Sequence, residues 1–176
     1  FDSFSTKELK EYLGKFRSDG IFAVAELLRR GTSVKELHEI TMITDLFLQS
    51  IRKIIDMEKT LKTNVNDRKV LRAAKEMGFS DVYIAKLWNE DEIEVFNLRK
   101  EKNIFPIFKM VDTLHSGKYI AYHYSSYTGE NESILSDKKK IVVLGAGPIR
   151  IGQGVEFDYS TVHAVTTIKN SGYEAI

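Results

Sequence analysis

The sequence contains no cysteine, so disulfide bonds and zinc sites built on thiolates are excluded. No apolar run approaches the roughly 20 residues that a membrane-spanning helix needs, and no membrane partner is expected. The absence of cysteine is also consistent with a reducing compartment, so we expect a cytoplasmic location.

Two kinds of catalytic site are missing as well. The chain has 4 histidines, but none stand in H-x-H or H-E-x-x-H spacing, and no G-x-S-x-G motif is present. The serines fall instead where helix caps and turns are expected. We therefore predict no catalytic residue and no metal ligand in this chain.

Basic and acidic residues are nearly equal in number. The chain carries 26 basic and 25 acidic residues, for a formal net charge of +1, and the two signs alternate along it. The tightest basic cluster, residues 138–140, is more typical of a solvated linker than of a phosphate site. Because a nucleic-acid-binding surface normally needs a basic stripe, no nucleic-acid partner is expected.

Helix-turn-helix spacing leaves one alternative, a DNA-binding module whose recognition helix would span residues 91–100. Such a helix points its first residues at bases and phosphates. Here Glu92 and Glu94 stand among those first residues, and carboxylates are repelled by the phosphate backbone. The charge pattern disfavours this alternative without removing it.

What the sequence does contain is a series of amphipathic helical segments up to about residue 103. Serine caps and glycine stops separate them, and two of these boundaries follow one scheme. Gly31 and Ser33 mark the first boundary. Gly78 and Ser80 mark the second boundary, about 47 residues later. This pattern hints at a duplicated helix-turn-helix unit, although two copies alone do not establish a repeat.

The pattern changes after Asn103. Residues 105–111 and 119–124 are aromatic and β-branched, and they predict either a hairpin or an extended arm. Residues 126–140 are rich in small polar and charged side chains, as is typical of a linker. We therefore place a domain boundary near Asp137, between a helical domain of residues 1–137 and a second domain of residues 138–176.

The second domain begins like an α/β unit. Residues 141–144 predict a strand buried on both faces of a parallel sheet. A glycine-rich loop follows, then a helix from about Ser160 to Asn170, and then a second strand opening at Tyr173. The predicted fold class is therefore mainly α, with a helical domain, a short extended arm and a truncated βαβ start. The chain stops within this unit, so we expect it to be a piece of a longer polypeptide.

The loop after the strand is a candidate anion site. Gly145, Gly147, Gly152 and Gln153 would place backbone N–H groups near a helix N-terminus, where an anion can bind. Arg150 stands where the dinucleotide fingerprint has its third glycine, which disfavours a nicotinamide-dependent enzyme, and the lysine of a P-loop is missing too. A purely structural tight turn remains an equal alternative.

Residues 145–159, with 162–164 after them, resemble the opening of a synthetase half in the large subunit of carbamoyl phosphate synthetase. Arg150 and Gly154 make the loop similar to that of the second half, which makes carbamoyl phosphate from carbamate. Three earlier stretches resemble landmarks of the helical oligomerization domain between the halves, namely residues 22–31, 85–87 and 122–127. The resemblance thus covers nearly the whole chain.

The resemblance implies a helical oligomerization domain followed by the start of a Rossmann-like pre-ATP-grasp domain. It implies a parent enzyme that is an ATP-dependent carbon–nitrogen ligase, using bicarbonate and glutamine-derived ammonia with ATP and Mg²⁺ or Mn²⁺ for pyrimidine and arginine biosynthesis. The implied partners are the remaining domains of the large subunit, the small glutaminase subunit and further copies of this chain. The fragment itself is expected to bind no cofactor and to be inactive.

The resemblance also assigns roles to particular residues. By similarity, Arg150, Gly154 and Glu156 would line a passage that delivers carbamate to the second active site. An arginine can hold a small anion bidentately, and a nearby carboxylate can orient that arginine. An ordinary ion pair between Arg150 and Glu156 is the alternative. For self-association we expect an exposed apolar patch that includes Phe47, Leu48 or Trp88.

Overall fold

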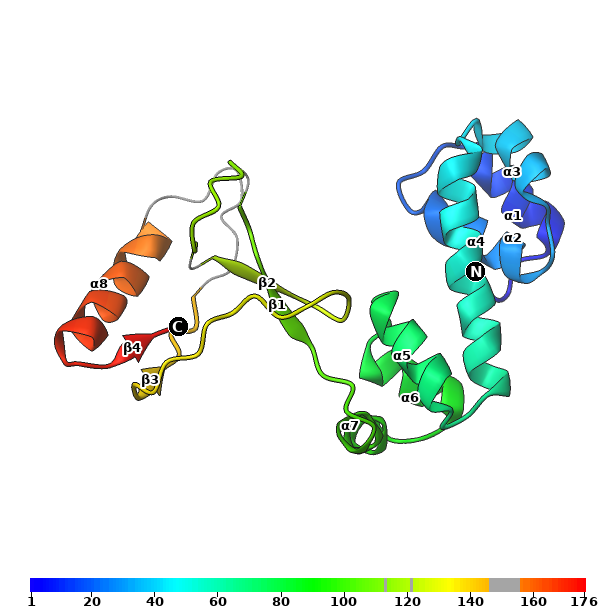
Figure 1. Cartoon of the computed structure of the whole chain (residues 1–176). Coiled ribbons are helices and arrows are strands. Elements are labelled where there is room, and N and C mark those ends of the chain that lie inside the picture. Colours follow the sequence, from blue (N-terminus) through cyan, green and yellow to red (C-terminus); the bar gives the residue numbers. More distant parts are fainter. Residues whose placement is uncertain (113, 121, 146–155) are drawn as a thin grey trace. The chain divides into compact units, whose positions relative to one another are not determined.

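The computed structural model describes residues 1–112, 114–120, 122–145 and 156–176, with only the backbone described for 156–158. The chain divides into two compact units, Phe1–Glu132 and Ser133–Ile176. Each unit has its own secondary structure, mostly helices in the first and a short strand–helix–strand unit in the second (Figure 1). The predicted fold class, mainly α with few short strands toward the C-terminus, is confirmed.

The helices of the first unit follow the predicted succession. They are α1 (Thr6–Leu13), α2 (Gly20–Arg29), α3 (Val34–Thr41), α4 (Asp45–Thr63), α5 (Arg68–Glu76), α6 (Asp81–Trp88) and α7 (Glu92–Glu101). Serine hydroxyls accept hydrogen bonds from the backbone of the first turn at Ser5, Ser33 and Ser80. These caps satisfy N–H groups that have no partner within the helix, which is why the helices begin where the sequence predicts.

The predicted repeat is present in the backbone. Gly31 and Gly78 end the first helix of each copy with φ of 92° and 90°. Ser33 and Ser80 then cap the second helix with ψ of 152° and 154°. Only glycine adopts such positive φ values without strain, so the two turns need it at the same place. The segment α2–α3–α4 and the segment α5–α6–α7 are therefore two copies of one unit, which we name repeat 1 and repeat 2.

The second helices of the two repeats also end alike. Both α3 and α6 have 8 residues, and each stops at a left-handed residue, Met42 with φ 59° and Asn89 with φ 58°. The third helices then begin after the extended residues Thr44 and Asp91. The offset stays at about 47 residues throughout, which establishes the duplication that the sequence only suggested.

Each repeat has its own hydrophobic core. The first core lies between α1 and the helices of repeat 1, and the second is built by the end of α4 and by repeat 2. The fully buried leucines and isoleucines of the first are Leu9, Leu27, Leu28, Leu37, Leu48 and Ile55, and those of the second are Leu61, Leu71, Ile84 and Ile104. Because α4 contributes to both, it links the two cores.

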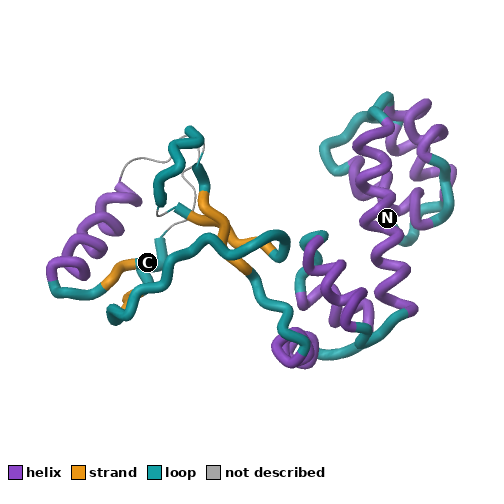
Figure 2. Tube along the Cα trace, viewed as in Figure 1, coloured by secondary structure: helices purple, strands orange, loops and turns teal. Residues whose placement is uncertain are grey.

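An antiparallel hairpin follows repeat 2. Its strands are β1 (Ile107–Met110) and β2 (His123–Ser126), paired with Ile107 opposite Ser126, and they are coloured orange in Figure 2. The chain then turns back along β1, where Phe108 N–H donates to Asn131 and Glu132 N–H donates to the Phe108 carbonyl at 2.8 Å. Of the two predicted forms for this region, the hairpin is the one observed.

The second unit contains β3 (Lys140–Ile141), α8 (Glu156–Asn170) and β4 (Glu174–Ala175). The two strands are parallel, with Lys140 opposite Glu174, so the predicted βαβ start is confirmed. Helix α8 begins at Glu156, earlier than the predicted Ser160. The predicted burial of the first strand was wrong, since Val142 is 62% and Leu144 is 92% exposed. In the described residues one strand and one helix accompany β3, too few to cover both faces of a sheet.

Candidate functional site

The predicted anion loop falls almost entirely outside the described residues. Gly147, Arg150, Gly152, Gln153 and Gly154 all lie there, and the structure places only the backbone of Glu156, the first residue of α8. The proposed grouping of Arg150 with Glu156 therefore stays a prediction.

Gly145 is the one loop glycine that the structure describes. A Cβ atom there would lie 3.8 Å from Thr161 Oγ1, an ordinary contact distance. Neither crowding nor a positive φ requires glycine at this position. At Gly145 the backbone therefore gives no support to the alternative of a tight turn that only glycine can make.

An apolar groove opens on the surface of the first unit, beside the first core. It has a volume of about 350 Å³ and is lined by Leu13, Phe16, Arg17, Gly20, Ile21, Val24, Thr41, Ile43, Phe47 and Ile51. Three of its large side chains are exposed, Phe16 by 75%, Ile21 by 55% and Phe47 by 63%. Contiguous apolar surface of this kind marks interaction sites in soluble proteins.

Phe16 is also held in an unfavourable backbone conformation. Its φ of 48° lies in the left-handed region, which bulky side chains rarely adopt. Its amide donates to the Leu13 carbonyl at 3.1 Å, which closes the turn that follows α1. The fold thus keeps an aromatic ring in water at the cost of local backbone strain, and such strain clusters at functional sites.

Two of the three side chains predicted for the exposed patch are instead buried. Leu48 is fully buried and belongs to the first core, because it shares the inward face of α4 with Ile55. Trp88 is 6% exposed, and its indole N–H donates to the Leu61 carbonyl at 2.8 Å. Only Phe47 is in the position predicted for an interaction surface.

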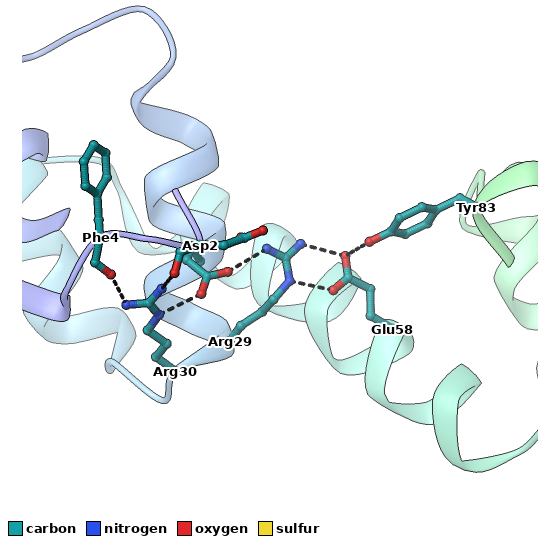
Figure 3. A network of polar contacts seen from close by, with 7 residues as sticks. Asp2, Phe4, Arg29, Arg30, Glu58 and Tyr83 are labelled. Atoms are coloured by element: carbon teal, nitrogen blue, oxygen red, sulfur yellow. Dashed lines mark hydrogen bonds and ion pairs between the residues drawn. The ribbon is translucent and has the colours of Figure 1, made fainter. Parts of the chain in front are cut away.

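A polar network joins the two repeats (Figure 3). Arg29 on α2 donates from Nε and Nη2 to both carboxylate oxygens of Glu58 on α4, at 2.8 and 2.9 Å, and the Tyr83 hydroxyl on α6 donates to Glu58 at 2.8 Å. Arg30 donates to the Phe4 carbonyl at 2.6 Å, which fastens the N-terminal segment. Each bond connects different elements, so the network is suited to fixing their positions.

The electrostatics of Glu58 follow from these bonds. Burial by itself would raise the pKa of Glu58, but the hydrogen bonds from Arg29 and Tyr83 outweigh it, and the pKa is lowered. Burial and the bond to Glu58 raise the pKa of Tyr83. The carboxylate is thus ionised and the phenol protonated at neutral pH, which favours a stable structural link and offers no acid–base chemistry.

A second charged cluster is buried within repeat 2. Asp81 accepts from Lys75 Nζ at 2.8 Å and from Arg99 Nη2 at 2.7 Å, and Lys75 and Arg99 are only 7% and 6% exposed. Burial would raise the pKa of Asp81, but the bonds from Arg99 and Lys75 prevail and lower it. We refer to Lys75, Asp81 and Arg99 as the buried triad.

Sequence reasoning missed both networks, because the bonds of Arg29 and Tyr83 to Glu58 and of Arg99 to Asp81 join residues 18 or more positions apart in the chain. One signal could have revealed the buried triad. At the offset of the repeat, Lys75 and Asp81 stand where repeat 1 has Leu28 and Val34. Charged residues at core positions of a duplicated unit indicate a buried ion pair.

Neither a metal site nor a membrane helix is seen in the described part of the chain. No group of three or more histidines, aspartates or glutamates could hold a metal ion among residues 1–112, 114–120, 122–145 and 156–176. Within the same residues, no helix is both long and apolar enough to span a membrane. Helix α7 carries Glu92 and Glu94 in its first turn, which does not favour the DNA-binding alternative.

Two family matches account for most of the sequence. Residues 2–103 match the family described as carbamoyl-phosphate synthetase large chain, oligomerisation domain. Residues 137–176 match the carbamoyl phosphate synthase preATP-grasp domain. The first match covers both helical repeats, and the second covers the parallel strands and α8. The chain therefore belongs to the large chain of carbamoyl-phosphate synthetase, an ATP-dependent ligase, and comprises its oligomerisation domain and the start of its preATP-grasp domain.

Proposed function

We propose that the helical part of this chain associates with a second copy of itself through the apolar groove, and that it docks the synthetase halves without being catalytic alone. The observation that carries the proposal is the strained, exposed Phe16 beside exposed Ile21 and Phe47. The family description, an oligomerisation domain, supports it independently.

The size of the groove is compatible with the centre of an interface. A buried aromatic side chain removes about 150–250 Å² from water, and a stable interface buries about 800 Å² per partner. Phe16, Phe47 and Ile21 would supply the apolar centre of such a patch. Contact between identical patches across a two-fold axis would bring the same apolar residues of both copies into one interface and close the assembly at a dimer.

Sedimentation equilibrium of the 176-residue chain tests the proposal. We expect the native chain to self-associate and Phe47→Asp to be monomeric, because a carboxylate cannot be buried unpaired at an apolar centre. Ile93→Asp is the matched control, since Ile93 is 60% exposed against 63% for Phe47 and has no part in the groove. A monomeric native chain at high concentration, or equal association of Phe47→Asp and the native chain, would contradict the proposal.

For the parent enzyme, we propose that Arg150, Gly154 and Glu156 line the carbamate passage, and that the domain boundary lies near Asp137. Gly145, Gly147, Gly152 and Gln153 would shape the loop around the anion. The similarity of residues 145–159 to the second synthetase half supports this role. The parent would use ATP with Mg²⁺ or Mn²⁺ and a glutaminase subunit, in the cytoplasm, to supply pyrimidine and arginine biosynthesis.

Replacing Arg150 in the full-length enzyme tests this second proposal. Arg150→Met should lower carbamoyl phosphate formed per ATP hydrolysed, because carbamate would be lost before it reaches the second site. Arg150→Lys should retain part of the coupling, since the charge stays while bidentate binding is lost. An unchanged ratio in Arg150→Met would indicate that Arg150 serves only as an ion-pair partner of Glu156.

A further inference from the structure

The buried triad lies where the two ends of the β1–β2 hairpin meet repeat 2. Arg99 Nη1 donates to the Ile104 carbonyl at 3.0 Å, just before β1 begins, and Ile104 is 1% exposed. Tyr127 follows β2 directly and packs against the second core. One cluster of charges therefore contacts the chain both as it enters and as it leaves the hairpin.

Tyr127 covers the two cations of the triad. The centre of its ring lies 4.9 Å from Lys75 Nζ and 5.7 Å from Arg99 Cζ. Cations at this distance from a ring face are attracted to its π-system, most strongly where water is excluded. The negative charge of Asp81 holds the cations together from within the protein, and the ring of Tyr127 closes the cluster from the hairpin side.

Repeat 1 shows that the helix-turn-helix fold does not need this cluster. Repeat 1 retains the arginine as Arg52 but has Leu28 and Val34 in place of the lysine and the aspartate. Both repeats nonetheless have the same turn and cap geometry. Since a buried ion cluster stabilises a fold little more than apolar residues would, folding of the helices alone does not account for the triad.

We propose that the buried triad and Tyr127 form a clasp that holds the base of the hairpin on repeat 2. When the clasp is closed, residues 104–127 are fixed at both ends. When Tyr127 leaves the cations, the paired strands β1 and β2 are released at this end, while Ile104 and both helical repeats stay in place. In this proposal repeat 2 holds the hairpin, a role distinct from the self-association proposed for repeat 1.

Backbone amide hydrogen exchange of the 176-residue chain tests the clasp. Tyr127→Ala should raise exchange in β1 and β2 on the order of tenfold, because loss of the ring shifts the local opening equilibrium. Exchange in α2, α3 and α4 should not change. Tyr127→Phe keeps the ring and should stay within about twofold of the native chain. Tyr124→Ala is the matched control, since Tyr124 lies on β2, is 52% exposed and is no part of the clasp.

A second variant keeps the test decisive if Tyr127→Ala folds poorly. The double substitution Lys75→Leu with Asp81→Val removes two of the three charges of the triad and gives repeat 2 the residues that repeat 1 has at these two positions. It should release the hairpin while the amides of α5, α6 and α7 remain protected. Unchanged hairpin exchange in either variant, equal effects of Tyr124→Ala and Tyr127→Ala, or uniform loss of protection over the first unit would overturn the proposal.

Discussion

Arg52 and Arg99 occupy the same position in the two helical repeats, but among the described residues only Arg99 has a carboxylate partner. Arg99 binds Asp81 through Nε and Nη2, whereas Arg52 donates from Nη2 to the Thr32 carbonyl at 3.2 Å and its buried Nε has no hydrogen-bond partner among the described residues. A buried donor without a partner costs free energy, so repeat 1 contains a position where a suitable acceptor would stabilise the protein.

Val34 is that position, because it corresponds to Asp81. We predict that Val34→Asp is more stable than Val34→Asn by about 1–2 kcal/mol at pH 7, since a charged acceptor binds a guanidinium more strongly than an amide does. Urea unfolding of the two variants measures the difference. The difference should decline as pH falls below the unfolded aspartate pKa of about 3.9, and it should vanish only below the lower folded-state pKa of the paired carboxylate. Equal stabilities at pH 7 would show that Arg52 cannot reach the new carboxylate.

The link between the repeats predicts a graded loss of stability. Tyr83→Phe should cost about 1 kcal/mol, because it removes one hydrogen bond to Glu58 and leaves the bonds from Arg29. Glu58→Gln should cost about 2 kcal/mol, because the partly buried bonds from Arg29 lose their charged acceptor. Differential scanning calorimetry of the two variants and the native chain measures both changes in the free energy of unfolding. A larger effect of Tyr83→Phe than of Glu58→Gln would contradict the hydrogen-bond assignment.

Acid should weaken the protein through the same carboxylates. The folded-state pKa values of Asp81 and Glu58 lie below their ordinary values. At a pH between the folded and the unfolded pKa of either group, the unfolded chain therefore binds more protons than the folded one. Their stabilisation is therefore present above the unfolded pKa values of about 4 and is lost as pH falls through the folded ones. Urea unfolding from pH 7 to pH 2 should show this decline, with a shallower slope in Glu58→Gln. If stability falls with pH as steeply in Glu58→Gln as in the native chain, Glu58 does not contribute to the decline.

Two glycines should respond oppositely to the same substitution. Gly78→Ala should destabilise the protein by about 1 kcal/mol or more, because its φ of 90° is unfavourable for a side chain. Gly14→Ala should be neutral or stabilising by about 0.5 kcal/mol, because Gly14 has φ −62° and a Cβ there would lie 3.6 Å from the Glu11 carbonyl. Denaturant midpoints of the two variants test this. Equal destabilisation by both would contradict this account, because a Cβ at Gly78 has nothing within 4 Å and only its φ sets it apart from Gly14.

The sequence predicts local features well because local residues determine them. The caps at Ser33 and Ser80 and the stops at Gly31 and Gly78 stand as predicted, since each depends on neighbours a few residues away.

Features that depend on distant residues could not be predicted in the same way. The exposure of Phe47 and the burial of Leu48 differ by one step around α4, and only packing against α2 and α3 decides between them. The hairpin base brings Tyr127 to Lys75 across a separation that no sequence pattern encodes. The passage residues Arg150 and Gly154 lie outside the described residues, so their grouping rests on family similarity.

The most direct test of self-association uses the absence of native cysteine. Met42 is 71% exposed and lies between Thr41 and Ile43 of the groove, so a spin label on Met42→Cys would report on its neighbourhood in each copy. Pulsed electron paramagnetic resonance should give one defined distance between the labels on two copies. That distance should disappear when Phe47→Asp is added. A signal without a defined distance, or a distance that persists in the Phe47→Asp background, would contradict association through the groove.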